Sequence, residues 1–169
     1  MLACTACRTT PMLRVLTAKD FAIVEHAELL PGQGMTALTG ETGAGKSLMV
    51  DALLLLGGAR GDSSMVRAGC ERAELSAEFE LAALPDVIEL LQGLELDDGS
   101  ECRLRRVLRT DGSSRAFAND RPVTLATLRQ IAERLVEIHG QHEHQALLQR
   151  SRQLAILDAS GALGAEREL

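Results

Sequence analysis

The stretch that decides the fold is Gly40-Glu41-Thr42-Gly43-Ala44-Gly45-Lys46-Ser47, which fills every fixed position of the P-loop pattern G-x-x-x-x-G-K-[ST]. Its three glycines can adopt backbone angles closed to other residues, so successive N–H groups can turn inward around phosphate oxygens. The lysine supplies a compact positive charge for the β- and γ-phosphates, and the serine hydroxyl is a ligand for Mg²⁺. We therefore predict that residues 40–47 bind ATP and Mg²⁺.

The residues on both sides of the loop support this interpretation. Residues 34–39 are typical of a short buried strand that enters the loop, and residues 47–56 of an apolar helix that leaves it. This order places the phosphates at a helix N-terminus, where the helix dipole favours anions. A chance glycine-rich turn is the alternative, and the matching flanks argue against it.

Length and composition set the outer limits. A chain of 169 residues forms one domain or part of a larger one. Its longest apolar run, residues 52–56, is far shorter than the roughly 18 residues that a membrane span needs. Residues 1–11 contain no secretory signal, so we expect a leader or tag and a cytoplasmic protein. Cys4 and Cys7 form a C-x-x-C without a second ligand pair, which favours reduced thiols over a zinc site.

Apolar alternation and turn residues predict the other elements. Two strands precede the one at 34–39, so three short strands come before the P-loop, which is more typical of an ABC-type ATPase head than of a minimal kinase or GTPase. The helix predicted to begin after Thr124 carries Leu125, Leu128 and Ile131 at helical spacing. The predicted strands are 13–21, 24–30, 72–81, 102–108 and 114–118, a short helix covers 85–91, and 119–122 form a turn.

Charge is unevenly distributed along the chain. The net charge is −6, which argues against indiscriminate binding of nucleic acid by the whole surface. Arg103 and Arg105 share one strand face and we expect Arg106 to lie near it, so the three could contact DNA phosphates or a partner's acidic face. The alternative is a solvated strand that pairs with the acidic strand at 74–80. We favour that alternative because no aromatic platform for bases accompanies the arginines.

A second informative stretch is Val136-Glu-Ile-His-Gly-Gln-His-Glu-His-Gln145. His139, His142 and His144 could in principle bind a metal, but their spacing matches no established zinc pattern. A polar loop that follows a strand is otherwise a natural place for groups that reach a nucleotide or its Mg²⁺.

Several stretches together resemble the N-terminal half of the RecN family of bacterial DNA repair proteins, which are SMC-like ATPases of the ABC superfamily. The string Ile-His-Gly-Gln-His-Glu-His-Gln at 138–145 is the most specific of them. The resemblance runs from about Met12 to the end of the chain. It rests also on Phe21-Ala-Ile-Val-Glu25, the P-loop, Leu-Leu-Leu-Gly-Gly at 54–58, Ser114-Arg-Ala-Phe-Ala-Asn119 and Arg121-Pro122.

The resemblance implies a fold, a function and partners. The fold class is α/β, the N-terminal lobe of an ABC-type P-loop ATPase head over residues 12–160, with an antiparallel β-subdomain. Gln141 would be the Q-loop glutamine that touches Mg²⁺ or the water near the γ-phosphate. Arg67 is a candidate nucleotide contact. The function implied is DNA double-strand break repair and recombination in the cytoplasm, associated with the nucleoid.

The family pattern also implies that this head is incomplete. A Walker B strand ending in Asp-Glu and a signature Ser-Gly-Gly do not occur in the chain. In the family they lie in a C-terminal half beyond a long coiled coil, which residues 161–169 would approach. The implied partners are that half, a second head engaged through ATP, and the DNA backbone. With Lys46 and Gln141 as its only catalytic groups, the chain should bind ATP with little or no hydrolysis.

One alternative remains open. Leu154-Ala-Ile-Leu-Asp158 has the shape of a Walker B strand, and Asp158 would then make this a self-contained P-loop kinase or NTPase. Against it, Ala159 stands where a glutamate would follow, and Ser151 begins what reads as a helix.

Overall fold

An antiparallel sheet dominates the computed structural model, which describes residues 12–32, 34–39, 45–82, 84–136 and 138. Its strand order is β2-β1-β3-β4-β5-β6. The chain divides into two units, Met1–Glu137 and Ile138–Leu169, and every element named below belongs to the first. The strands are β1 (Met12–Phe21), β2 (Val24–Leu29), β3 (Arg72–Glu80), β4 (Glu101–Arg109), β5 (Ser114–Ala118) and β6 (Arg121–Val123).

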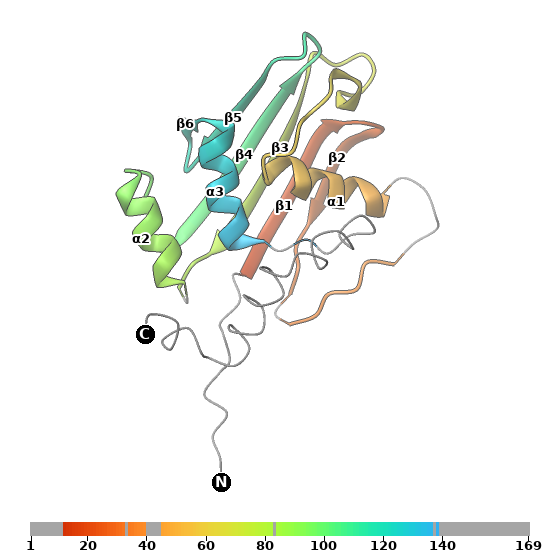
Figure 1. The fold of residues 1–169 in the computed structure, drawn as a ribbon. Helices are drawn as coiled ribbons and strands as arrows, with labels where there is room; N and C mark the ends of the chain where they lie inside the picture. The colour runs from red at the N-terminus through yellow and green to blue at the C-terminus, as the bar shows by residue number, and fades with distance from the viewer. Residues whose placement is uncertain (1–11, 33, 40–44, 83, 137, 139–169) are drawn as a thin grey trace, which may run out of the picture. The chain divides into compact units, whose positions relative to one another are not determined.

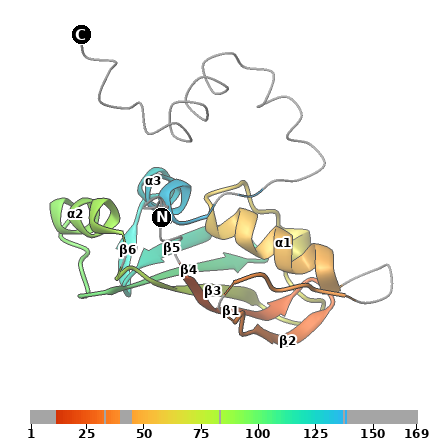
Figure 2. The same ribbon diagram turned by 90° about the horizontal axis from the view of Figure 1, so that it is seen from below.

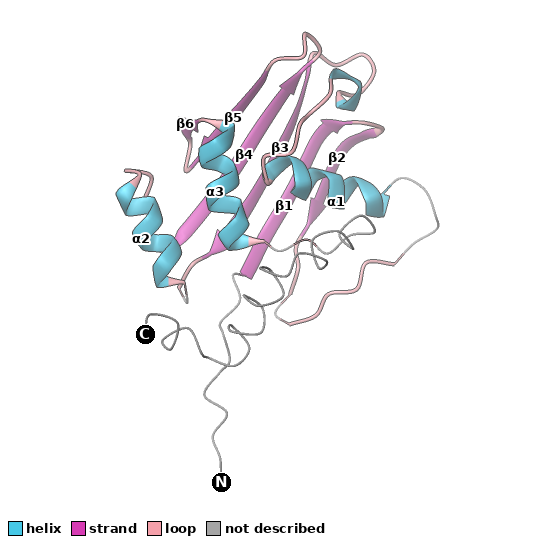
Figure 3. Ribbon diagram, in the orientation of Figure 1, coloured by secondary structure: helices cyan, strands magenta, loops and turns pink. Residues whose placement is uncertain are grey.

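Helices α1 and α3 pack on one face of this sheet, and α2 lies on the same side (Figures 1 and 2). Figure 3 separates the helices, in cyan, from the strands, in magenta. The helices are α1 (Gly45–Leu56), α2 (Pro85–Gly93) and α3 (Leu125–Leu135), with a short 3₁₀ turn η1 (Ser63–Met65) after α1. No helix in the described part of the chain is long and apolar enough to cross a membrane.

Alternation along the strands builds the core between the sheet and the helices. On β3 the inward residues Ala73, Leu75, Ala77 and Phe79 are all buried, as the alternating pattern predicts. Neighbouring strands add inward residues at the same level, since Leu75 pairs with Ala18 on one side and with Arg106 on the other. The inward side chains of neighbouring strands therefore form one continuous layer, on the face of the sheet that α1 and α3 cover.

Local signals explain where the helices begin. Thr124 caps α3, because its side chain accepts a hydrogen bond from the N–H of Thr127 at 3.1 Å. Pro85 occupies the first position of α2, where a missing N–H costs nothing. Leu128, Ile131, Ala132 and Leu135 of α3 are buried at helical spacing. Leu125 is the first residue of this helix, as predicted, but its side chain is 40% exposed.

Two predictions about the sheet need correction. The sequence predicts a turn over residues 119–122. In the structure Asn119 and Asp120 alone form the turn, in left-handed conformations at φ 46° and 60°, and the short strand β6 follows. Pro122 lies in β6 at the edge of the sheet, where its missing N–H leaves no ladder partner unsatisfied. The second correction is the strand predicted at residues 34–39, which is described below with the P-loop.

Candidate nucleotide-binding site

The described part of the P-loop is its last three residues, which form the first turn of α1. Gly45, Lys46 and Ser47 begin the helix, Lys46 is half-buried, and Ser47 is exposed. The first turn carries no acidic side chain. The helix dipole and the lysine charge therefore present a positive helix end to which an anion can bind. Residues 40–44 lie outside the described part of the chain.

Packing against the sheet holds α1 in place. Ala52, Leu55 and Leu56 are at most 2% exposed and belong to the main core cluster. The helix ends at Gly57 and Gly58, as predicted. Gly58 adopts φ +84°, a left-handed conformation that glycine takes without strain. The C-terminal half of the helix is thus held in the core, and nearer its N-terminus Leu48 and Met49 are partly buried against the same cluster.

The strand predicted at residues 34–39 is absent. These residues form no strand and are exposed throughout, with Met35 at 96% and Leu38 at 47%. A strand exists only where a neighbour completes its hydrogen-bond ladder, and none of the six described strands pairs with this segment. The prediction that three strands precede the P-loop is therefore wrong, since β1 and β2 are the only ones described there.

Of two other predicted site residues, Arg67 is described and Gln141 is not. Arg67 lies in the loop before β3, where its backbone N–H donates to Asp20 O at 2.9 Å and its guanidinium pairs with Glu25 at 3.6 Å. Glu25 is 78% exposed, so this ion pair restrains Arg67 only weakly. Gln141 and the histidines at 139, 142 and 144 lie outside the described residues, as do Cys4 and Cys7. Their predicted roles stay predictions.

Arg103 and Arg105 lie on the outer face of the sheet, as predicted, and pair with the acidic strand β3. Arg103 Nε is 2.8 Å from Glu78 Oε1, and Arg105 Nη1 is 3.2 Å from Glu74 Oε1. The guanidinium of Arg105 also stacks 4.0 Å from the centre of the Phe117 ring. The interpretation of β4 as a strand that pairs electrostatically with its acidic neighbour is confirmed, and a DNA contact by these two residues stays a prediction.

Arg106 does not lie near that surface. It is 1% exposed and points to the inner face of β4, because strand side chains alternate and Arg106 follows the parity of the buried Leu104 and Leu108. This burial contradicts the prediction that Arg106 belongs with Arg103 and Arg105 as a DNA or partner contact. Counting alternate residues from the apolar positions of β4 would have found its true side.

Instead, Arg106 binds the end of α1. Its Nη1 donates to Leu55 O at 2.7 Å and also to Ala59 O, and its Nη2 is 3.4 Å from Ser114 Oγ. Burial lowers the pKa of its guanidinium, and no carboxylate lies within ion-pair distance among the described residues. The partly negative C-terminal carbonyls of α1 compensate part of its charge.

No group of three or more His, Cys, Asp or Glu side chains in the described part of the chain is arranged to hold a metal ion. The two cysteines in the described part of the chain, Cys70 and Cys102, are free thiols. Burial raises the pKa of the Cys102 thiol to about 12. This thiol is therefore a core residue and not a reactive group at neutral pH.

Comparison with known families and curated proteins identifies relatives of the whole chain. The family model of the AAA domain matches residues 16–167. A DNA repair protein RecN from Xylella fastidiosa strain Temecula1 is 57% identical over 157 residues, which cover 93% of this chain and 28% of that protein. RecN from Vibrio cholerae is 46% identical over 147 residues, covering 87% of this chain and 26% of that protein. The resemblance to RecN is confirmed, and the chain spans little more than a quarter of these relatives.

Solved structures with a similar fold include SMC heads. The Smc head domain of Pyrococcus furiosus, which carries an extended coiled coil and is bound to the C-terminal domain of ScpA, gives a TM-score of 0.70 at 22% identity. That likeness covers 94% of this chain and 44% of the other. A structure from work on ATP-driven dimerization and DNA-stimulated activation of SMC ATPases gives a TM-score of 0.63 at 20% identity and covers 87% and 98%.

These likenesses confirm the predicted fold class, an α/β ATPase head lobe with an antiparallel β-subdomain. They do not favour the self-contained kinase that would use Asp158, a residue outside the described part of the chain.

Proposed function

This chain belongs to the AAA-domain family, and from that premise we propose that it is the ATP-binding N-terminal half of an SMC-like ATPase head. The whole protein would act in DNA double-strand break repair and recombination, in the cytoplasm and associated with the nucleoid. The similarity to RecN over 93% of the chain supports this assignment.

The observation that carries the proposal is the P-loop sequence at the N-terminus of a helix whose first turn has no acidic residue. Because no carboxylate there repels an anion, the positive helix end and Lys46 can both act on the β- and γ-phosphates. The backbone N–H groups of residues 40–45 would surround the phosphate oxygens.

The residues present also fit Mg²⁺. The exposed Ser47 hydroxyl, one residue after Lys46, is the oxygen ligand that the P-loop pattern supplies, and by resemblance Gln141 would be a second. Bound Mg²⁺ would neutralise charge on the phosphates. Arg67, held by its backbone and only weakly by Glu25, remains a candidate nucleotide contact.

We further propose that the site is completed by other segments. The family's catalytic carboxylate and signature sequence would come from a C-terminal half and from a second head, and bound ATP would hold the two heads together. The lobe would extend over residues 12–160, and residues 161–169 would lead toward a coiled coil. Because Arg106 is buried, any contact of this strand with the DNA backbone would fall to Arg103 and Arg105, which also pair with β3.

Titration of the 169-residue chain with ATP and Mg²⁺ tests the nucleotide site. We expect Lys46→Ala to weaken ATP binding by a factor of about 10–150, since a charge-assisted contact to phosphate of about 1.5–3 kcal/mol is lost. Lys19→Ala, the loss of the chain's other lysine in strand β1, is the matched control. Equal affinities of the two variants would refute a nucleotide site at the P-loop.

A second measurement tests the incomplete head. ATP hydrolysis should be near background for this chain alone and should rise when the C-terminal half is added, because the catalytic carboxylate is expected there. Full activity of the lone chain would support the alternative that uses Asp158. No gain on mixing would count against a split head.

A further inference from the structure

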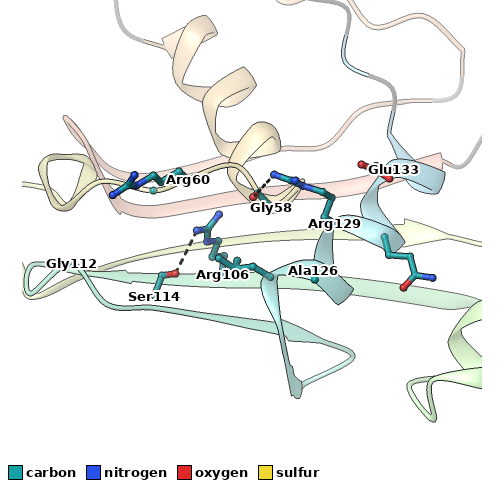
Figure 4. Close-up of a pocket in the computed structure, with 11 residues that line it drawn as sticks. Gly58, Arg60, Arg106, Gly112, Ser114, Ala126, Arg129 and Glu133 are labelled. Carbon is teal, nitrogen blue, oxygen red and sulfur yellow. Dashed lines mark hydrogen bonds between the residues drawn. The ribbon is translucent and has the colours of Figure 1, made fainter. Parts of the chain in front are cut away.

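A pocket lies at the opposite end of α1 from the P-loop, where the helix, the β4–β5 hairpin and α3 meet (Figure 4). Its volume is about 590 Å³. It is lined by residues from three separate parts of the chain: Gly58, Arg60 and Gly61 after α1, Arg106, Gly112 and Ser114 from the hairpin, and Leu125, Ala126, Arg129, Gln130 and Glu133 from α3.

Positive charge dominates the lining. Arg60, Arg106 and Arg129 each contribute a guanidinium, against the single carboxylate of Glu133. Glu133 stands four residues after Arg129 on α3, yet the two form no ion pair within 4 Å among the described residues. Arg129 Nη2 instead lies 3.3 Å from Gly58 O (Figure 4). The pocket therefore holds more positive charge than its own acid can balance.

The N-terminus of α3 adds to this charge. Leu125 and Ala126, the first two residues of the helix, line the pocket, and their N–H groups have no carbonyl partner within the helix. The side chain of Thr124 caps the N–H of Thr127, not these two. The first turn of α3 contains no acidic residue, so the dipole at this end is not neutralised.

A separate observation comes from the buried Arg106. Its Nε has no hydrogen-bond partner among the described residues, although the side chain is only 1% exposed. A buried guanidinium without a carboxylate is costly, and the carbonyl oxygens at the end of α1 compensate its charge only in part. An anion in the adjacent pocket would supply the missing compensation.

Arg60 is the most available of the three guanidinium groups. It is exposed and no ion pair or hydrogen bond of its side chain is found within the described residues. The charge of Arg60 acts on Asp62: hydrogen bonds with Ser64 are the main cause that lowers the pKa of Asp62, and Arg60 lowers it more weakly. Asp62 does not line the pocket.

We propose that this pocket is an anion-binding site for a phosphate group, separate from the P-loop. Arg60 and Arg129 would donate to the phosphate oxygens together with the N–H groups of Leu125 and Ala126, above the buried charge of Arg106. Guanidinium groups favour phosphate because their planar N–H pairs match its oxygens in bidentate contacts. The group can belong to a small phosphate ligand or to the backbone of a nucleic acid.

The test uses the whole 169-residue chain with Lys46→Ala, so that phosphate binding at the P-loop does not contribute. Pyrophosphate is titrated into this background, and the Nε–H signals of the arginines are followed by NMR. We expect saturable binding that shifts the Arg106 Nε–H signal. Absence of pyrophosphate binding, or binding that leaves this signal unchanged, would overturn the proposal.

Variants locate the site. Arg60→Gln with Arg129→Gln should weaken pyrophosphate binding about tenfold or more, because two charge-assisted contacts are lost. Arg134→Gln, an exposed arginine of α3 outside the pocket, is the matched control and should change the affinity less than about twofold. If the double variant fails to fold, Arg60→Gln alone replaces it, since the Arg60 side chain makes no described hydrogen bond whose loss could disturb the fold. An equal loss of pyrophosphate affinity in Arg134→Gln would overturn the proposed site.

A parallel titration with a short DNA duplex separates the two sources of phosphate. If the paired substitutions weaken binding of both pyrophosphate and DNA, the site takes a nucleic-acid backbone; if they weaken pyrophosphate alone, it takes a small ligand. Both results support the pocket. Because the P-loop is inactivated throughout, a failure here leaves the proposed ATP site unaffected, and the reverse also holds.

Discussion

Replacing Arg106 by alanine should destabilise the protein far more than replacing Arg103, although both arginines lie on β4. Arg106 is 1% exposed and its guanidinium binds the carbonyls of Leu55 and Ala59 at the end of α1. Arg103 is about half exposed and pairs with the similarly exposed Glu78. The two substitutions remove the same charge and the same stem, so their difference isolates the effect of burial.

The magnitude follows from what Arg106 contacts. Each hydrogen bond from a charged donor contributes about 1.5–3 kcal/mol, and each buried methylene of the stem about 0.8 kcal/mol. Removing the guanidinium also relieves its desolvation, which costs several kcal/mol. We expect a net loss of about 3 kcal/mol in the free energy of unfolding, or about 6–12 °C in Tm. For Arg103→Ala the loss should stay below about 1 kcal/mol.

Urea unfolding followed by far-ultraviolet circular dichroism measures both variants, since the chain contains no Trp or Tyr for fluorescence. Arg106→Met keeps the apolar stem without the charge and should lose about 1–2 kcal/mol, intermediate between wild type and alanine. If Arg106→Ala costs no more than Arg103→Ala, the assignment of Arg106 as the group that holds the end of α1 is refuted.

Three further predictions test the fold. Burial raises the pKa of the Cys102 thiol to about 12, so the stability that the neutral thiol contributes is fully present below about pH 8.5 and is lost as the pH rises toward 12. Cys102→Ala should therefore reduce this loss of unfolding free energy with pH, measured by urea unfolding. An unchanged dependence on pH would contradict the burial of the thiol. Thr124→Ala should lower the free energy of unfolding by about 1 kcal/mol by removing the N-cap of α3, and no loss would mean that the cap is not formed. Gly58→Ala should cost about 1–3 kcal/mol, since its φ is +84° and a Cβ would lie 3.0 Å from a side-chain carbon of α3, whereas Gly32→Ala, with nothing within 4 Å, should cost less than about 1 kcal/mol.

Elements with a strong local signal were predictable from the sequence. Strand β3 shows clean alternation, and its inward residues Ala73, Leu75, Ala77 and Phe79 are buried. Thr124 and Pro85 marked the starts of α3 and α2. The P-loop pattern requires particular residue types at fixed spacing, so a helix could be predicted from Ser47 without knowledge of the rest of the fold, and α1 begins two residues earlier, at Gly45.

Elements that depend on distant partners were not predictable in the same way. Strand β6 is three residues long and contains a proline, and it exists because β5 offers it a ladder. The segment at 34–39 has the composition of a buried strand but finds no neighbour in the described sheet. Composition states what a segment can form, whereas a hydrogen-bond ladder needs a second segment.

For the P-loop itself, the sequence alone determined the residues available to hold phosphate and the helix that follows them. The tertiary structure decided how the other end of that helix is held, by Arg106 from a strand some fifty residues further along the chain. The same packing brought Arg60 and Arg129 to one pocket. A local pattern encodes local geometry because backbone periodicity repeats over a few residues, but charges meet across a core only after strands and helices have packed.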